Sequence, residues 1–304
     1  MTDRKPILAL LACLVVAGLT PFVASTYLLG VALELLMWIA LAESWILLSG
    51  MTGYISLGHA VFFGAGSYIM VLSWGVLPFW LAVPLAGLVA GLLALCIGYP
   101  CLRVRGPYFV ILSFGVAEFV KFVVVSIEAG LGKAGRLLFG TPSLETLYFI
   151  MLALATISVV TAYLVRRSRF GAGLRAIRED EDAAETIGVP ATRFKLMAYG
   201  LSAIIPGMVG AVMILRSTYF EPLQVFNPVV SFTIVSMAII GGSDDAPGPL
   251  MGALFLVVLS ELLWANLPEL YMIILGALLV GFVLGAPNGI YGWLKARRKV
   301  GAGA

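Results

Sequence analysis

The sequence has few charged residues. Only 12% of its 304 residues are Asp, Glu, Lys or Arg, whereas 61% are apolar. A typical soluble domain carries about 25% charged and about 45–50% apolar residues. So few charges cannot cover a surface that faces water, which excludes an ordinary soluble domain. Together with a mean hydropathy of +1.06, this composition predicts a protein whose solvent is lipid.

Cysteine and histidine are also scarce. Cys13, Cys96 and Cys101 lie in or at the edge of apolar runs and form no C-x-x-C pair, so we interpret them as small apolar side chains. His59 is the single histidine and cannot build a zinc site alone. The sequence contains no H-E-x-x-H motif and no G-x-x-x-x-G-K-[ST] motif. We therefore expect no catalytic residue, metal or cofactor in this chain, and a separate chain must bind ATP and Mg²⁺ if ATP is used.

Long apolar runs fill most of the sequence. A spanning helix needs roughly 20 apolar residues, and ten segments qualify: 7–28, 30–50, 57–75, 79–102, 107–127, 145–165, 196–217, 226–242, 249–265 and 270–292. The third, eighth and ninth are short or flanked by Gly and Pro, so each could be a half-helix or a re-entrant segment. We predict an all-α integral membrane protein with a single transmembrane domain over 1–304.

The basic residues are placed asymmetrically. If the N-terminus is inside and the chain crosses ten times, the inner loops and tails hold 15 of the 19 Lys and Arg residues. This pattern predicts a multi-pass protein of the bacterial inner membrane with both termini in the cytoplasm. A signal peptide ending at Val23-Ala24-Ser25 is the alternative for the first segment, and either interpretation places residue 26 outside.

The longest hydrophilic segment, 166–195, falls on the predicted inner side. Within it, 174–187 has no Gly or Pro, Gly173 precedes that run, and Gly188 and Pro190 follow it. Gly after a helix and Pro soon afterwards are typical stop signals. We predict one cytosolic helix of about 14 residues, roughly 21 Å long.

This predicted helix is amphipathic. Its apolar stripe consists of Leu174, Ile177, Ala184 and Ile187. Charged side chains cover the rest: Arg175, Arg178, Glu179, Asp180, Asp182 and Glu185. The pattern fits a solvated helix on top of the membrane bundle equally well as a helix that docks a partner protein.

A resemblance favours docking. Asp182-Ala183-Ala184, three residues and then Gly188 resemble the E-A-A-x-x-x-G loop of ABC importer permeases, with Asp for Glu. In that family the loop forms a coupling helix that enters a groove on the ATPase subunit. The resemblance implies an ATPase-coupling surface made of Gly173, Arg175, Ala176, Arg178, Glu179, Asp182, Ala183, Ala184 and Gly188.

Two further motifs resemble one branch of this family, the permeases of branched-chain amino acid importers. Residues 53–68 read G-Y-I-S-L-G-H-A-V-F-F-G-A-G-S-Y, and Gly241-Gly242 precedes Gly248-Pro249. The chain departs from the branch at 128–136, E-A-G-L-G-K-A-G-R, where T-G-G-x-x-G is common. That loop faces the side from which substrate arrives, so the resemblance does not extend to the identity of the cargo.

The resemblance implies a fold and a set of partners. The fold is the type II importer permease fold of about ten helices, with short or broken helices. The partners are cytosolic ABC ATPase subunits, a second and commonly different permease chain, a periplasmic substrate-binding protein and the lipid bilayer, with no nucleic acid. The implied cargo is a branched-chain amino acid or a related small polar or amphipathic molecule.

Candidate pathway residues fall into two groups. Ser56, Gly58, His59 and Phe62 open a short helix whose N-terminus could face an anionic substrate group, although Gly58, Gly64 and Gly66 equally fit close helix packing. Glu34 and Glu43 lie within one span, some 100° apart around the helix, so one of them can face the pathway while the other does not.

Other charges within the predicted spans suggest an alternative function. Glu118 and Lys121 are three residues apart and can pair with each other, and Glu261 lies in a later span. A charge at the bilayer centre costs at least about 2.5–3.5 kcal/mol, so such residues face protein or water. An ion-coupled secondary carrier or channel that uses these carboxylates is the alternative to the importer.

Overall fold

The computed structural model describes residues 4–132, 135–242 and 247–266, and beyond these only 270, 273–274, 276–277, 280–281 and 289–293. The described part is helical apart from two short strands. In chain order the elements are α1 (Arg4–Val23), α2 (Thr26–Thr52), α3 (His59–Ser73), α4 (Phe79–Cys101), α5 (Pro107–Gly130), β1 (Arg136–Leu137), α6 (Leu144–Arg167), α7 (Arg169–Glu179), α8 (Glu181–Thr186), α9 (Ala191–Ser217), β2 (Tyr219–Phe220), α10 (Pro222–Val225), α11 (Val229–Gly241) and α12 (Pro247–Asn266).

The prediction of an all-α membrane protein is confirmed, but ten spans are not. Seven of the described helical stretches are long and apolar enough to cross a membrane, and one of them is Pro222–Gly241, which contains α10 and α11. Taken alone, α3 has 15 residues and α11 has 13, so they measure about 22 Å and about 20 Å, less than the roughly 30 Å of a hydrocarbon core. The predicted tenth segment, 270–292, lies largely outside the described residues.

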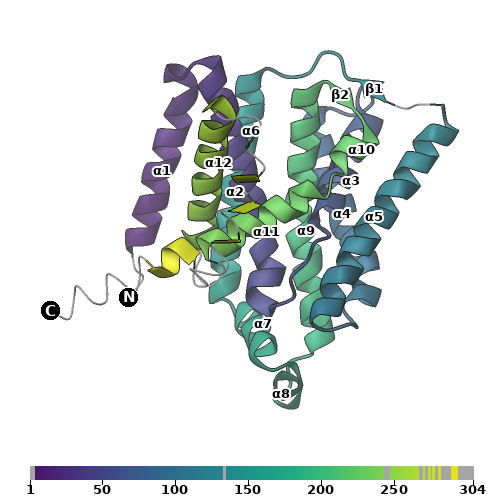
Figure 1. The fold of residues 1–304 in the computed structure, drawn as a ribbon, viewed down its shortest axis with the longest axis vertical. Helices are drawn as coiled ribbons and strands as arrows, with labels where there is room; N and C mark the ends of the chain where they lie inside the picture. The colour runs from purple at the N-terminus through teal and green to yellow at the C-terminus, as the bar shows by residue number, and fades with distance from the viewer. Residues whose placement is uncertain are drawn as a thin grey trace.

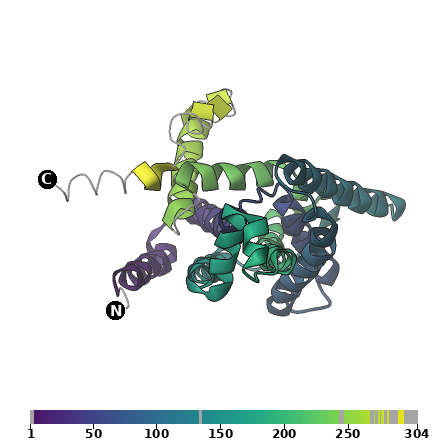
Figure 2. The same cartoon turned by 90° about the horizontal axis from the view of Figure 1, so that it is seen from below.

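α11 also differs from its neighbours in direction. Figures 1 and 2 show it running across the bundle, whereas α2, α6 and α9 run along it. The chain turns before it, since α10 ends at Val225 and Pro228 is the N-terminal cap of α11. A proline lacks a backbone N–H and fits the start of a helix better than its interior. The expected half-helix character of the eighth segment thus agrees with the structure.

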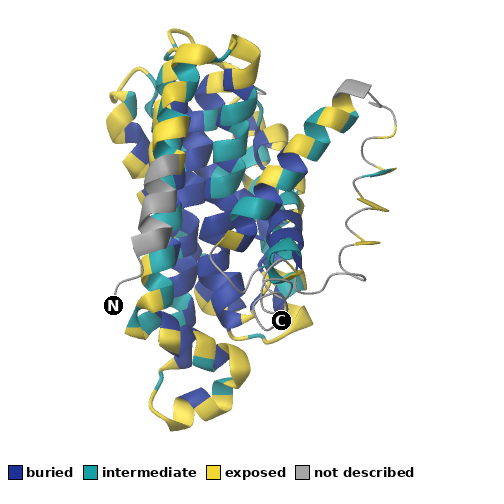
Figure 3. Ribbon diagram, turned by 90° about the vertical axis from the view of Figure 1, so that its left-hand side faces the viewer, coloured by how far each residue is buried: buried dark blue, intermediate teal, exposed yellow. Residues whose placement is uncertain are grey.

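The core of the protein lies around α2 and α9. Both have most of their central residues buried, and α9 packs against α2, α3, α4 and α6. Figure 3 shows the buried positions gathered along the middle of the bundle. α5 stands at the edge (Figure 1), and only 11% of the residues in its most apolar stretch are buried. Its outer face is apolar, as expected for a helix that meets lipid or another membrane chain.

Glycines let α3 and α9 approach closely. A Cβ atom on Gly66 would overlap the backbone of Gly207, and one on Gly210 would overlap the backbone of Phe63. A Cβ on Gly64 would overlap the ring of Phe226. Small residues at a helix interface bring backbones together and increase their van der Waals contact. The packing role expected for Gly64 and Gly66 is therefore confirmed.

The two ends of the bundle differ. We call the end formed by 53–58, 102–106 and 166–195 the basic end, because it carries most of the described Arg and Lys residues. At the opposite end, β1 pairs antiparallel with β2 and joins the loop after α5 to the end of α9. The buried carboxylate of Glu128 holds this loop, since it accepts hydrogen bonds from Arg136 Nη2 at 2.6 Å and from Tyr68 Oη at 2.8 Å.

The single helix predicted over 174–187 is wrong. α7 already begins at Arg169, so Gly171 and Gly173 lie inside it, and the chain breaks at Asp180 before α8 begins. Asp180 is extended, and its carboxylate accepts hydrogen bonds from the backbone N–H groups of Asp182 at 2.9 Å and Ala183 at 3.0 Å. An Asp at this position satisfies N–H groups that a new helix leaves free, so α8 starts there as a separate helix.

Candidate functional site

The first candidate site is the short helix α8, which forms the tip of the basic end (Figure 1). Its outward face is exposed and consists of Asp182, Ala183, Glu185, Thr186 and, just beyond the helix, Ile187. Ile187 was expected on one apolar stripe with Ala184, yet it is 75% exposed whereas Ala184 is buried. The stripe does not continue past Ala184, because α8 is a separate helix that ends before Ile187. Gly188 follows with a φ of +90°, which suits glycine at the end of a helix.

Ala184 faces the protein and not the solvent. It is 2% exposed and packs with Ile177 of α7 and Ala191 of α9. Gly173 is also buried, and a Cβ atom there would overlap the ring of Phe194. Among the residues predicted to form the coupling surface, Ala184 and Gly173 thus hold α7, α8 and α9 together, while Ala183 is the alanine that a docking partner can reach.

Glu181 connects α8 to the transmembrane bundle. Its carboxylate lies 2.6 Å from Lys195 Nζ of α9 and accepts a hydrogen bond of 2.6 Å from the Tyr54 hydroxyl. Lys195 is 2% exposed and also donates to the Leu102 carbonyl oxygen at 3.2 Å and to the Tyr54 hydroxyl at 3.0 Å. This cluster joins α8, α9 and the loops at 53–58 and 102–106, so a movement of α8 reaches all of them.

Arg105 covers the outer side of this cluster. Its guanidinium lies 3.6 Å from the Glu181 carboxylate and 3.0 Å from the Asp182 carboxylate. The hydrogen bond from Arg105 lowers the pKa of Asp182 below its usual range. Burial and the hydrogen bond to Glu181 raise the pKa of Tyr54, which keeps its hydroxyl protonated and able to donate. Asp182 is therefore ionised, and its pair with Arg105 intact, throughout the neutral range.

The remaining predicted coupling residues anchor α7 or lie at its surface. Arg178 donates to the Gly50 carbonyl oxygen at the end of α2 at 2.9 Å, and Arg175 donates to the Arg166 carbonyl oxygen of α6 at 2.8 Å. Ala176 is half-buried, and Glu179 is exposed. The two arginines thus neutralise C-terminal carbonyl groups of the transmembrane helices and hold α7 against the bundle.

The second candidate site is the segment that enters α3. Ser56 and Gly58 are buried, and side chains of α2 and of the segment itself hold their backbone. The Ser56 carbonyl accepts a hydrogen bond from Trp45 Nε1 at 2.9 Å, and its N–H donates to Ser49 Oγ at 3.2 Å. The N–H of Gly58 donates to Ser56 Oγ at 3.2 Å. These contacts fix the backbone conformation that the S-L-G-H motif adopts.

His59 and Phe62 complete this segment. Both are fully buried and lie edge-on to the ring of Tyr199. His59 Nδ1 lies 3.3 Å from Ser56 Oγ, and Nε2 has no hydrogen-bond partner in the described part of the chain. The N–H of Ala60 at the start of α3 already donates to Ser231 Oγ at 2.8 Å. The packing interpretation of this motif fits these contacts better than a helix N-terminus open to an anion.

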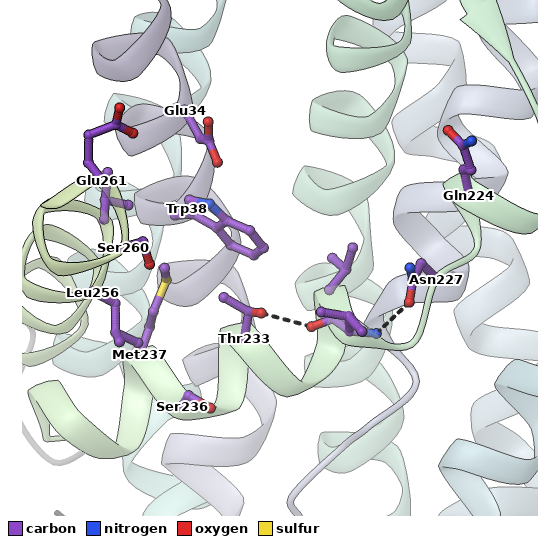
Figure 4. A pocket seen from close by; sticks show the side chains of 13 residues that line it. Glu34, Trp38, Gln224, Asn227, Thr233, Ser236, Met237, Leu256, Ser260 and Glu261 are labelled. Atoms are coloured by element: carbon purple, nitrogen blue, oxygen red, sulfur yellow. Dashed lines mark hydrogen bonds between the residues drawn. The ribbon is translucent and has the colours of Figure 1, made fainter. Parts of the chain in front are cut away.

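The third candidate site is a cavity of about 290 Å³ between α2, α10, α11 and α12 (Figure 4). Glu34 lines it, whereas Glu43, nine residues later on α2, is fully buried elsewhere, and neither of its carboxylate oxygens has a hydrogen-bond partner in the described structure. The two carboxylates thus lie in different surroundings, and that one of them faces the translocation pathway stays a prediction. The other lining residues are Trp38, Gln224, Asn227, Val229, Val230, Thr233, Ser236, Met237, Leu256, Val257, Ser260 and Glu261.

Sequence reasoning missed several members of these sites. The sequence analysis assigned no function to Tyr54, Glu181 or Lys195, because they are separated in the sequence and each resembles an ordinary loop residue. A signal was present for the cavity, since Gln224 and Asn227 are polar residues within an otherwise apolar stretch. Such residues at membrane depth face protein or a water-filled cavity.

Comparisons with known proteins identify the family. Residues 27–283 match the family described as branched-chain amino acid transport system / permease component. High-affinity branched-chain amino acid transport system permease protein LivM is 28% identical in Salmonella typhimurium, over 98% of this chain and 78% of the relative, and 27% identical in Escherichia coli, over 99% and 78%. LivH of Salmonella typhimurium is 23% identical over 83% of this chain and 90% of the relative. No solved structure matches. This chain belongs to the family of permease components of branched-chain amino acid transport systems, which are non-catalytic transport subunits.

Proposed function

We propose that this chain is the transmembrane permease subunit of an ABC importer and that α8 docks the ATPase. The single observation that carries the proposal is the combination of an exposed helix at the tip of the basic end with the cluster around Glu181 that ties this helix to the bundle. A docking helix needs a free outer face and a firm inner attachment, and α8 has both. The exposed face offers small and acidic side chains, Ala183, Asp182 and Glu185, to a partner.

We assign the basic end to the cytoplasm, and with it both termini of the chain. The concentration of Arg and Lys at 102–106 and 166–195 supports this orientation, because positive residues are retained on the cytoplasmic side of the bacterial inner membrane. ATP and Mg²⁺ then belong to the separate ATPase chain on that side. The opposite end, closed by the β1–β2 pair, faces the periplasm and the substrate-binding protein.

The cargo of this importer is a branched-chain amino acid or a related small amphipathic molecule. The names of the LivM and LivH relatives support this class of substrate. Two different permeases from one organism, Salmonella typhimurium, are both similar to this chain, which supports a second and different permease as its partner in the membrane. Glu34, at the cavity, is the part of the proposed pathway that contacts substrate, while Ser56, Gly58, His59, Phe62 and Glu43 pack its wall.

This function can be tested by purifying the tagged chain in mild detergent and identifying the proteins that co-purify with it. We expect a cytosolic ATPase to co-purify in stoichiometric amount, and Ala183→Glu to abolish that association while the chain remains folded. A bulky charge on the exposed face of α8 blocks docking without touching the interior. Ala184→Glu is a poorer test, because Ala184 is buried against Ile177 and Ala191 and the substitution disturbs the chain itself.

Leu137→Glu is the matched control. Leu137 is 62% exposed on β1, at the end of the molecule opposite α8, so its substitution introduces the same charge far from the docking surface. We expect it to leave the ATPase bound. Retention of the ATPase by Ala183→Glu, or absence of an ATPase from the wild-type preparation, contradicts the proposed function.

A further inference from the structure

The cavity between α2, α10, α11 and α12 has an unbalanced charge. Two of its lining residues, Glu34 and Glu261, are carboxylates, and none is Lys, Arg or His. Glu261 accepts a hydrogen bond from the Tyr27 hydroxyl. Glu34 has no hydrogen bond or ion pair with any described residue. Arg216 lies against Gly30, one turn before Glu34 on α2, but it forms no ion pair with Glu34. Carboxylates within a membrane span face protein or water and usually pair with another group, so a cation that enters the cavity would supply the partner that no described residue gives Glu34.

The far side of the cavity has the opposite preference. Figure 4 shows Gln224 and Asn227 across the cavity from Glu34 and Glu261. Asn227 Oδ1 accepts a hydrogen bond of 3.0 Å from the N–H of Val229, which leaves the amide NH₂ group as a donor. α11 begins at Val229, and the positive end of a helix dipole favours an anion. This side therefore suits a carboxylate.

An apolar wall lies beside the two carboxylates. Trp38, Met237, Leu256 and Val257 line the cavity together with the polar residues, and Figure 4 shows Trp38, Met237 and Leu256 on the same side as Glu34 and Glu261. Specific sites for small molecules combine such apolar walls with a few placed polar groups. A branched aliphatic group fits this wall, because it buries apolar surface without leaving a polar group unpaired.

We propose that this cavity binds a small zwitterion, with its primary ammonium group at Glu34 and Glu261, its carboxylate at Gln224 and Asn227, and an aliphatic side chain against Trp38 and Met237. The proposal rests on the transport function proposed above and adds the groups that recognise the substrate. It also separates zwitterionic amino acids from amides or carboxylic acids without an ammonium group, which cannot pair with the two carboxylates.

Chemical modification of a cysteine at Ser260 tests the site without any ATPase. Ser260 lines the cavity and makes no side-chain hydrogen bond with a described residue. The variant is the full chain with Ser260→Cys, in which Cys13, Cys96 and Cys101 are changed to alanine. Its modification is followed in membrane vesicles. A cationic methanethiosulfonate should react at least about tenfold faster than an anionic one, because the two carboxylates concentrate cations. Millimolar L-leucine should slow the reaction, and 4-methylpentanoate, which lacks the ammonium group, should not.

Two further variants make the test specific. Glu34→Gln with Glu261→Gln should remove the preference for the cationic reagent and the protection by leucine together. Ser143→Cys, an exposed position before α6, should show neither effect. No protection by leucine, equal protection by 4-methylpentanoate, or an unchanged reagent preference in the glutamine variant would overturn the proposal. Protection by leucine in a chain that binds no ATPase would remove the importer function and leave the zwitterion site standing.

Discussion

At the scale of single residues, the pair of Glu181 and Lys195 is the most consequential contact. Lys195 is almost fully buried, yet it keeps three partners: the Glu181 carboxylate, the Tyr54 hydroxyl and the Leu102 carbonyl oxygen. A buried cation is stable only when its hydrogen bonds and its counter-charge are all present. The side chains around Lys195 must therefore move together, which suits a joint that transmits motion between α8 and the bundle.

Removing this counter-charge should be costly. We expect Glu181→Gln to destabilise the folded chain by about 3 kcal/mol, because it leaves the Lys195 ammonium group buried without a negative partner. The measurement is the thermal unfolding midpoint of the purified chain in detergent, followed by substrate-stimulated ATP hydrolysis of the complex, which should fall with it.

Two variants control this prediction. Glu185→Gln changes an exposed carboxylate of the same helix that has no contact with a described basic side chain, and it should leave unfolding unchanged. Adding Lys195→Met to Glu181→Gln removes the stranded cation and should restore part of the lost stability. If the double variant is less stable than Glu181→Gln alone, the buried charge is not the cause.

The pair of Arg105 and Asp182 sets the pH response of α8. The pKa of Asp182 is lowered in the folded chain, so the stabilisation by this pair is present above the ordinary carboxyl pKa and is lost only as pH falls through the lowered value. We expect hydrogen exchange of residues 181–186, corrected for the intrinsic rate, to be constant from about pH 6 to about pH 8. Asp182→Asn should speed it at every pH in that range. Faster corrected exchange at pH 6 than at pH 8 in the wild type contradicts this account.

At the scale of elements, Asp180 decides where α7 ends and α8 begins. The 174–187 run contains only residues that a helix accepts, so composition predicts one helix. The structure has two, because the Asp180 side chain bonds to the N–H groups of Asp182 and Ala183. A capping Asp followed by acidic residues in the first turn, Glu181 and Asp182, was the signal in the sequence. Propensity alone overlooked it because neither Gly nor Pro marks the break.

Removing this cap should loosen α8 alone. We expect Asp180→Ala to weaken α8 by about 1 kcal/mol, seen as roughly fivefold faster hydrogen exchange within residues 181–186, since a factor of ten corresponds to about 1.4 kcal/mol. The adjacent Glu179→Ala, which removes a carboxylate that caps no helix, should leave this exchange unchanged. Equal effects of the two substitutions would show that capping does not hold α8 in place.

The contact between α3 and α9 depends on glycine. A methyl group at Gly66 meets the backbone of Gly207 and not a flexible side chain, so the helices must separate. We expect Gly66→Ala to destabilise the chain by at least about 2 kcal/mol. Gly115→Ala on α5 is the matched control, because no atom lies within 4 Å of the added methyl group. It should be neutral or stabilising by up to about 1 kcal/mol, and both are measured by thermal unfolding in detergent.

At the scale of the whole molecule, hydropathy predicts most of the helices but not their arrangement. The predicted 79–102 and 145–165 correspond to α4 and α6 within a few residues, because a lipid-facing helix must be continuously apolar. The same rule cannot tell that α11 crosses the bundle, since a buried helix is apolar in any direction. The cavity depends on that crossing, which brings Asn227 and Thr233 of the α10–α11 region to Glu34 of α2. Glu34 and Glu261 could therefore be named from the sequence, but their meeting with Asn227 and Thr233 around one cavity could not.

An ATP-driven importer and an ion-coupled carrier differ in what they require of the charges within the spans. A carrier needs a carboxylate that takes up and releases protons, and Glu118 was a candidate from the sequence. In the structure Glu118 forms an ion pair with Lys121 on the same helix. The two opposite charges lie three residues apart and can neutralise each other, so the pair places two charges within an apolar helix.

Uptake measurements separate the two mechanisms. In vesicles that contain this chain and its co-purified partners, we expect uptake of L-leucine to require ATP inside and to survive collapse of the proton gradient. Glu118→Gln should lower the thermal stability of the chain, because Lys121 loses its counter-charge, but leave the pH profile of uptake unchanged. Uptake driven by an ion gradient without ATP, with a pH profile that shifts in Glu118→Gln, would assign Glu118 the coupling role. The cluster around Glu181 would then have no ATPase to couple. The importer requires the Glu181 cluster and not Glu118 for coupling, whereas the carrier requires Glu118 and not the Glu181 cluster.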